Sequence, residues 1–225
     1  MAPTLAVIDA VFVAAAATAI AAALMALDVL HDVAKPVATA VLVAAVWQRG
    51  LERRDPAFAR LLIAGLIFSV AGDVALMFAG FFIPGLVAFL GAHLCYIALF
   101  KRGVPWLPSL SALGATLFAA LALYVFLFPG LDAVLRVAVA VYAAVIAVMA
   151  AQAIGRAAVL REGAGAAAGA VLFMVSDALL ATDRFADPLP LAPLWVLATY
   201  WAAQWLIARL AVPAGVLRVT AARRA

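Results

Sequence analysis

The stretch GLIFSVAGDVALMF, residues 65–78, places one carboxylate, Asp73, inside an apolar run. Further along the chain, GAVLFMVSDALLAT at 169–182 repeats this pattern around Asp177. An ionisable side chain at bilayer depth is costly, so it normally faces the interior of a helix bundle and marks a functional site. The two stretches therefore predict membrane helices that turn their carboxylates inward.

The composition points to lipid as the surrounding medium. Of the 225 residues, 70% are hydrophobic and 12% are charged, whereas soluble domains have roughly half and a quarter. A chain of this length cannot bury so much apolar surface within itself. We therefore expect an all-α integral membrane protein, since strands would alternate in segments of about ten residues.

Eight apolar runs are separated by charges, prolines and glycines. A span needs about 20 such residues, and lipid leaves no water for unpaired backbone groups, so each run is expected to be a helix. The first run is too long for a signal peptide and is expected to be retained. Without a compositional break, residues 1–225 are predicted to form one domain. The runs are 5–27, 33–48, 57–80, 82–100, 108–128, 133–154, 164–183 and 191–211.

Two local signals predict details of helix packing. Pro36 suits the first turn of the second span, where no backbone N–H is missed. Gly165 and Gly169 form a small-xxx-small pair in the seventh span, which favours close helix contact.

The distribution of Lys and Arg predicts the orientation. Twelve of the fifteen lie after spans 2, 4 and 6 or near the C-terminus, and only Lys35, Arg136 and Arg184 lie on the opposite side. Both termini are therefore expected to be cytoplasmic. The twelve are Arg49, Arg53, Arg54, Arg60, Lys101, Arg102, Arg156, Arg161, Arg209, Arg218, Arg223 and Arg224.

Several functional classes are disfavoured by the residues present. The basic residues form short clusters between apolar runs, unlike the basic stripe of a nucleic-acid-binding surface. The only nitrogen and sulfur ligands for zinc are His31, His93 and Cys95, and His93 and Cys95 face different ways on a helix. No serine has a recognisable nucleophile motif near a histidine. We expect neither a metal nor another cofactor.

The topology predicts a polar pocket. At ~1.5 Å per residue, Asp73 and Asp177 both lie about 10 Å below the outer membrane edge. Lys35 and its acidic neighbour Asp28 lie above that level, so the pocket is expected to open on the extracytoplasmic side. The polar residues that approach from spans 4 and 8 are His93, Tyr96, Tyr200 and Gln204.

Each of these residues also has a purely structural interpretation. The aspartates are protonated carboxyls between helices in that case, and His93 is a packing donor. Lys35 would extend to the interface, and the remaining polar groups would join helices. In the functional interpretation, two nearby carboxyls in a low dielectric cannot both ionise, which gives one acid and one base. Such a pair suits hydrolysis of an acid-labile C–O bond through an oxocarbenium-like state.

The chain resembles the YhhN family of membrane proteins, the lysoplasmalogenases. The segments that carry the resemblance, in order, are HDVAKPVATA, FSVAGDVALMF, GLVAFLGAHLCYIALF, VYAAVIAVM, LFMVSDALLATDRF and TYWAAQWLIA. The resemblance implies hydrolysis of the vinyl ether bond of lysoplasmalogens, which gives a fatty aldehyde and a glycerophospho-ethanolamine or -choline. The family's paired aspartates fall on Asp73 and Asp177, its Lys-Pro on Lys35 and Pro36, and its histidine on His93.

Together these readings predict a membrane hydrolase, in a bacterial plasma membrane, with Asp73 and Asp177 as the catalytic pair. Lys35 is expected to hold the lipid phosphate. Two rival classes are a proton-coupled transporter, which would favour broken helices and an inverted repeat, and a lipid-binding protein without activity.

Overall fold

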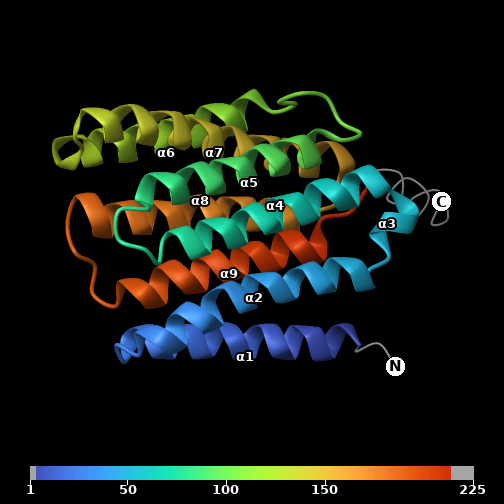
Figure 1. Cartoon of the computed structure of the whole chain (residues 1–225). Coiled ribbons are helices and arrows are strands. Elements are labelled where there is room, and N and C mark those ends of the chain that lie inside the picture. Colours follow the sequence, from blue (N-terminus) through green and yellow to red (C-terminus); the bar gives the residue numbers. More distant parts are fainter. Residues whose placement is uncertain (1–3, 214–225) are drawn as a thin grey trace.

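The computed structural model describes residues 4–213, and this part of the chain contains helices and no strands. Residues 1–3 and 214–225 lie outside the described part. The predicted cytoplasmic location of the two chain ends therefore concerns residues that the structure does not describe. Eight long helices run up and down the bundle (Figure 1). They are α1 (Leu5–Leu24), α2 (Asp28–Gln48), α4 (Pro56–Ala75), α5 (Phe82–Lys101), α6 (Leu110–Leu127), α7 (Ala133–Leu160), α8 (Ala164–Phe185) and α9 (Ala192–Leu210), and the short α3 (Leu51–Arg54) and the 3₁₀ turn η1 (Phe128–Gly130) lie in connections.

Each predicted run corresponds to one long helix. Seven of these in the described part, α1, α2 and α4 to α8, are long and apolar enough to cross a membrane. The eighth, α9, is rich in tryptophan and carries Tyr200 and Gln204, which lower its hydropathy. Large apolar side chains cover the outside of the bundle; Phe118, for example, is 75% exposed. Such a surface would favour aggregation in water, and it suits lipid.

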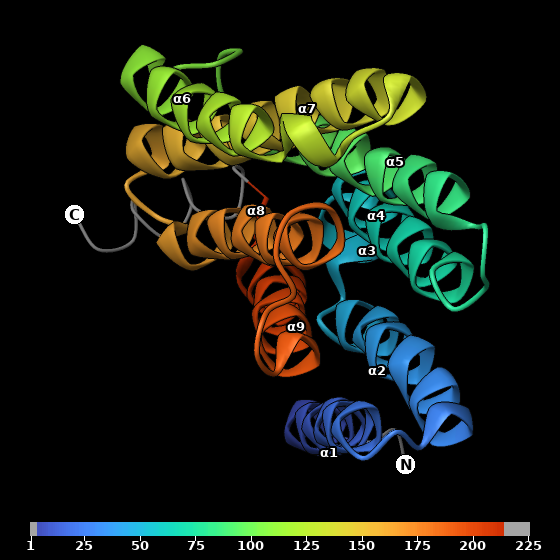
Figure 2. The same ribbon diagram turned by 90° about the vertical axis from the view of Figure 1, so that its left-hand side faces the viewer.

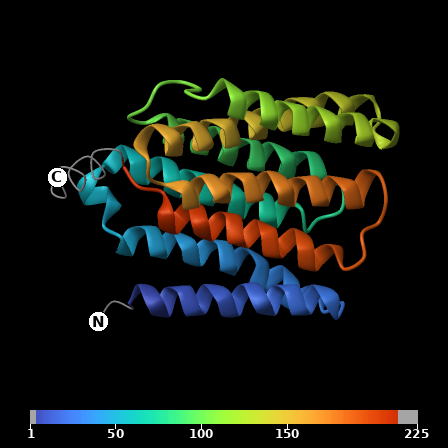
Figure 3. The ribbon, with the colours of Figure 1, turned by 180° about the vertical axis from the view of Figure 1, so that it is seen from behind.

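Neighbouring helices pair in sequence and then stack into one bundle. The pairs α1–α2, α4–α5, α6–α7 and α8–α9 are each in close contact, and α5 also packs on α7 and α2 on α4. Figure 2 shows the α1–α2 pair at one side and the α6–α7 pair at the other. From behind, α8 and α9 cover α4 and α5 (Figure 3). The middle of the bundle is therefore enclosed by α2, α4, α5, α7, α8 and α9.

The predicted small-residue pair lies at the contact between α8 and α9. A Cβ on Gly169 would lie 2.9 Å from the Ala203 carbonyl oxygen of α9, and one on Gly165 would lie 2.3 Å from Leu210 Cδ1. Because neither glycine has a Cβ, the α8 and α9 backbones can approach closely at these positions, as small-residue pairs allow in membranes.

Three predicted helix boundaries are wrong, and one of them is the end of α7 at Leu160, six residues beyond the predicted 154. The helix α2 begins at Asp28, so Pro36 lies inside it and not in its first turn; because proline has no N–H, it cannot donate the usual bond to Asp32. The helix α4 ends at Ala75, five residues short of the predicted 80, and the chain then passes through turns to Gly80, whose φ is +83°. Asp73 therefore lies in the last turn of α4.

Arginines fasten the end of the bundle that carries α3. Arg156 of α7 donates hydrogen bonds to the carbonyls of Arg102 and Val212, and Arg49 donates to those of Ala208 and Ala211. Burial, together with neighbouring arginines, lowers the pKa of Arg49 to about 10, so it keeps its charge at neutral pH. These bonds satisfy carbonyls that helix ends leave without partners.

The α8–α9 contact gives a stability prediction. Gly169→Ala should lower the free energy of unfolding by about 1–3 kcal/mol, because the added methyl meets backbone and forces the helices apart. Gly114→Ala is the matched control, since a Cβ there has nothing within 4 Å and alanine favours a helix. Thermal unfolding in detergent measures both, and equal midpoints would contradict the close contact.

Candidate functional site

The first polar cluster surrounds Asp73, whose side chain is 2% exposed. Thr39 Oγ1 and the Tyr200 hydroxyl each donate a 2.8 Å hydrogen bond to Asp73 Oδ2. The Lys35 ammonium lies 3.9 Å from the other oxygen, Oδ1. Helices α2 and α9 therefore bring a cation and two hydroxyl donors to the buried carboxylate of α4.

This cluster continues toward α5 through Gln204. The Gln204 amide Nε2 donates to the Tyr200 oxygen at 3.3 Å, and the Tyr96 hydroxyl donates to Gln204 Oε1 at 2.8 Å. All three of these side chains are buried. The structure thus brings Tyr96, Tyr200 and Gln204 together, in a chain of donors and acceptors that ends at Asp73.

The second polar cluster surrounds Asp177 on α8. The Tyr142 hydroxyl donates a 2.6 Å hydrogen bond to Asp177 Oδ2, and His93 Nε2 lies 2.8 Å from the Tyr142 oxygen and 3.4 Å from the same carboxylate oxygen. His93 is fully buried, and its Nδ1 has no hydrogen-bond partner in the described structure. Asp177 itself is less enclosed, with 18% of its side chain exposed.

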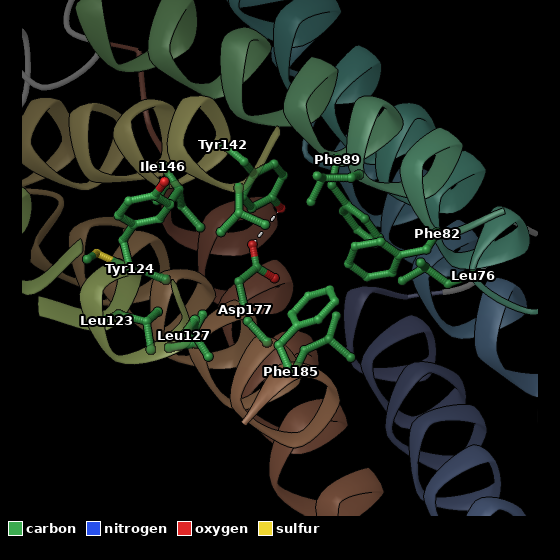
Figure 4. A pocket seen from close by; sticks show the side chains of 17 residues that line it. Leu76, Phe82, Phe89, Leu123, Tyr124, Leu127, Tyr142, Ile146, Asp177 and Phe185 are labelled. Carbon is green, nitrogen blue, oxygen red and sulfur yellow. Dashed lines mark hydrogen bonds between the residues drawn. The ribbon is translucent and has the colours of Figure 1, made fainter. Parts of the chain in front are cut away.

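Asp177 lies in the wall of an apolar cavity of about 70 Å³ (Figure 4). The Tyr142 hydroxyl is beside it, and the rings of Phe82, Phe89 and Phe185 lie around the same space. Since a single water needs about 10–15 Å³, the cavity can hold several small groups. Asp177 is the only charged residue in its wall, which is formed by Leu76, Phe82, Leu86, Phe89, Leu123, Tyr124, Leu127, Val139, Tyr142, Ala143, Ile146, Met174, Asp177, Ala178, Leu180, Ala181 and Phe185.

Aromatic rings separate the two clusters. Phe89 lines the cavity on one side, and its ring centroid lies 5.9 Å from that of Tyr200 on the other. Phe173 packs edge-on against both His93, at 4.7 Å, and Tyr200, at 5.5 Å. No hydrogen bond or ion pair joins Asp73 to Asp177 within residues 4–213. The two aspartates therefore occupy adjacent environments, each with its own tyrosine, and do not share a proton directly.

Lys35 lies deeper than the sequence indicated, whereas Asp28 lies at the junction of the first two long helices, as predicted. Lys35, expected at headgroup level, is only 9% exposed and points to Asp73. Asp28 is exposed in the first turn of α2. Within that part of the chain, no group of three His, Cys, Asp or Glu side chains could hold a metal.

The sequence did not identify Thr39 and Tyr142 as hydrogen-bond donors to the two carboxylates. Both are uncharged and lie in apolar runs, where a hydroxyl often bonds to its own helix. The available signal was helical spacing: Thr39 is four residues after Lys35 and therefore on the same face of α2.

Both clusters lie in a part of the chain that is similar to known proteins. Residues 30–211 match the YhhN family, a range that includes every residue of both clusters. The chain belongs to the YhhN family. Lysoplasmalogenase TMEM86A of Bos taurus is 36% identical over 165 residues, which are 70% of this chain and 67% of the relative.

Other relatives carry the same activity in their names. Lysoplasmalogenase TMEM86B of Homo sapiens is 36% identical over 67% of this chain and 62% of its own length, and the TMEM86B of Sus scrofa is 36% identical over 74% and 70%. The matches thus span about two thirds of these relatives. No solved structure matches the chain.

The contact between Lys35 and Asp73 gives a second stability prediction. Lys35→Met should lower the free energy of unfolding by about 3 kcal/mol, because it leaves a buried carboxylate without its cation. Adding Asp73→Asn should recover part of that loss, since the charge that needed the cation is gone. Unfolding of both variants in detergent measures the coupling, with Arg60→Met, at an exposed position, as the control. Strictly additive losses would show that the pair is not coupled.

Proposed function

We propose that this YhhN protein is a membrane lysoplasmalogenase, which hydrolyses the vinyl ether bond of a lysoplasmalogen to a fatty aldehyde and a glycerophospho-ethanolamine or -choline. The observation that carries the proposal is a single carboxylate, Asp177, in the wall of an otherwise apolar cavity. The relatives named lysoplasmalogenase support the same reaction. An alkenyl chain suits the apolar wall, and the bond to be cleaved needs one proton donor.

Asp177 is assigned as the general acid. Its protonated carboxyl gives a proton to the β-carbon of the enol ether, which leaves an oxocarbenium ion at the carbon attached to oxygen. Water adds to that carbon and loses a proton to the ionised Asp177, so that one carboxyl acts first as acid and then as base, as in retaining glycosidases. The hemiacetal then collapses to aldehyde and alcohol, with one water consumed.

The neighbours of Asp177 keep it in position for this exchange. Tyr142 donates to Oδ2, which leaves Oδ1 to face the substrate. His93 lies within reach of both Tyr142 and Asp177, and it orients them through its ring nitrogen. Removal of the Tyr142 hydroxyl should therefore reduce turnover, because Asp177 would no longer be held in position.

Asp73 is assigned the electrostatic part of the pair. It does not line the cavity. The Phe89 ring, which does, packs against Tyr200, and the Lys35 ammonium lies 3.9 Å from Asp73 Oδ1. A preorganised negative charge near the developing cation stabilises the transition state. Lys35 acts through Asp73 in this arrangement.

Asp177→Asn should therefore lower kcat by roughly 10²–10⁴, the usual contribution of a general acid. Asp73→Asn should leave measurable turnover, because it removes a charge and not the proton donor. Aldehyde release from an alkenyl lysophospholipid by purified protein in detergent measures both, and Asp187→Asn, in the exposed loop after α8, is the matched control.

Folding of each variant is checked by thermal unfolding, so that loss of structure is separated from loss of chemistry. Full turnover in folded Asp177→Asn would overturn the assignment. Binding of the lipid without aldehyde release by the unaltered protein would favour the rival lipid-binding function.

The proposed topology has eight spans, cytoplasmic termini and a cavity toward the extracytoplasmic side of a bacterial plasma membrane. The end of the bundle with α3 carries Arg49, Arg53 and Arg54, which supports a cytoplasmic location for it. The 19 residues of α9 give a length of about 28 Å, close to the ~30 Å hydrocarbon core. The cavity is nearer the opposite end, where α4 and α8 finish.

Reporter fusions test this topology. Fusions in the 49–56 connection and at the C-terminus should report the cytoplasm, and one at 186–190 should report the outside, because positive charge is retained on the cytoplasmic side. Opposite locations for 49–56 and the C-terminus would mean an odd number of spans between them and would exclude α9 as a span.

A further inference from the structure

Two arginines lie at the loop end of the Asp177 cavity. The Arg184 guanidinium carbon Cζ is 4.2 Å from the Phe82 ring centroid and 5.7 Å from that of Phe185, and both rings line the cavity. On the other side, Arg136 Cζ is 4.1 Å from the Phe128 ring, in the turn that follows α6. Arg184 thus rests on rings that line the cavity, and the Phe128 ring under Arg136 lies 5.8 Å from the ring of Tyr124, which also lines it.

The two arginines lie at similar heights above the acid. Arg184 follows Asp177 by seven residues on α8, which is about 10 Å along the helix axis, and Arg136 precedes Tyr142 by six residues on α7, which is about 9 Å. Tyr142 is hydrogen-bonded to Asp177, so the two axial distances, to Arg184 and to Arg136, start from about the same height in the bundle. Two helices that run in opposite directions thus present one cation each at the same level.

Neither guanidinium is in an ion pair among residues 4–213, where the pairs join Lys35, His93, Arg102 and Arg209 to aspartates. Arg136 Nε is buried and has no hydrogen-bond partner within that range. The nearby carboxylates Asp132 and Asp183 accept backbone N–H bonds at the start of α7 and after α8. The exposed Asp187 lies in the loop. The arginines are therefore available to an anion.

We propose that Arg136 and Arg184 bind the phosphate of the lysolipid headgroup while the alkenyl chain occupies the cavity; this rests on the proposed function. In a lysoplasmalogen, the glycerol unit places the phosphorus about six bonds from the vinyl carbon, or roughly 7 Å at the rise of an extended chain. An arginine side chain is long enough to span the difference between this length and the roughly 9–10 Å that separate each arginine from the acid along its helix. Its planar fork suits a phosphate, and stacking on a ring holds it in place.

Lys35 is less well placed for this contact. Its ammonium faces Asp73, and Phe89 stands between that cluster and the cavity. The phosphate site is therefore assigned to the two arginines, and Lys35 is assigned to the charge of Asp73.

The test compares two substrates in phospholipid-free detergent: an alkenyl lysophosphatidylcholine and a 1-alkenylglycerol without phosphate. Arg136→Gln and Arg184→Gln should each raise KM for the phospholipid roughly tenfold, the loss of one charged hydrogen bond, with kcat unchanged. KM for the alkenylglycerol should not change. Arg184→Lys should recover part of the affinity, and Arg60→Gln, at the other end of the bundle, is the matched control.

Binding of a non-hydrolysable alkyl-ether lysophosphatidylcholine gives a readout without turnover. Weaker binding of it by the glutamine variants supports the phosphate site even if the unaltered protein releases no aldehyde, an outcome that would reject only the proposed reaction. Unchanged KM and binding in both variants would overturn the site. An effect that appears only in phospholipid bilayers would also overturn it, because the arginines would then contact bulk lipid headgroups.

Discussion

A carboxylate inside hydrocarbon must be paired, hydrogen-bonded or protonated, and this requirement organises the whole bundle. Asp73 is stabilised by two hydroxyls and an ammonium from α2 and α9. Asp177 is held by a tyrosine and a histidine from α7 and α5. The helices that supply these partners are the ones that enclose the centre of the protein. The partners of the two carboxyl groups thus come from helices that also form the centre of the bundle.

The proposed roles of the two aspartates rest on their different surroundings. Asp73 is enclosed, and its partners are an ammonium and two hydroxyl donors. Asp177 has a tyrosine donor and a histidine beside it and lies in a cavity wall. A sequence pattern shared by both residues, a small residue followed by Asp, therefore leads to two distinct environments through the helices that pack against each one.

Much of this arrangement was predictable from the sequence, because the energetic terms are large and local. Apolar runs of sufficient length must be helices in lipid, and the eight runs correspond to the eight long helices. Close contact at Gly169 followed from residue size. What could not be predicted depended on packing between distant segments: the start of α2 before Pro36, the turn of Lys35 toward Asp73, and the choice of Tyr142 as the partner of Asp177. Uncharged hydroxyls and rings give no one-dimensional signal of which neighbour they will meet.

The position of α6 has a consequence for how a lipid reaches the cavity. This helix packs chiefly on α7, yet its Leu123 and Tyr124 face the same cavity as Phe82 and Leu86 of α5. The outer faces of α5 and α6 carry exposed apolar residues such as Val87 and Leu121, which suit lipid. A single-chain lipid that slides in sideways there never leaves the hydrocarbon, so the concentration that governs its capture is its mole fraction in the leaflet. The bilayer's own composition, and not the amount of lipid in bulk solution, then sets how often the site is filled.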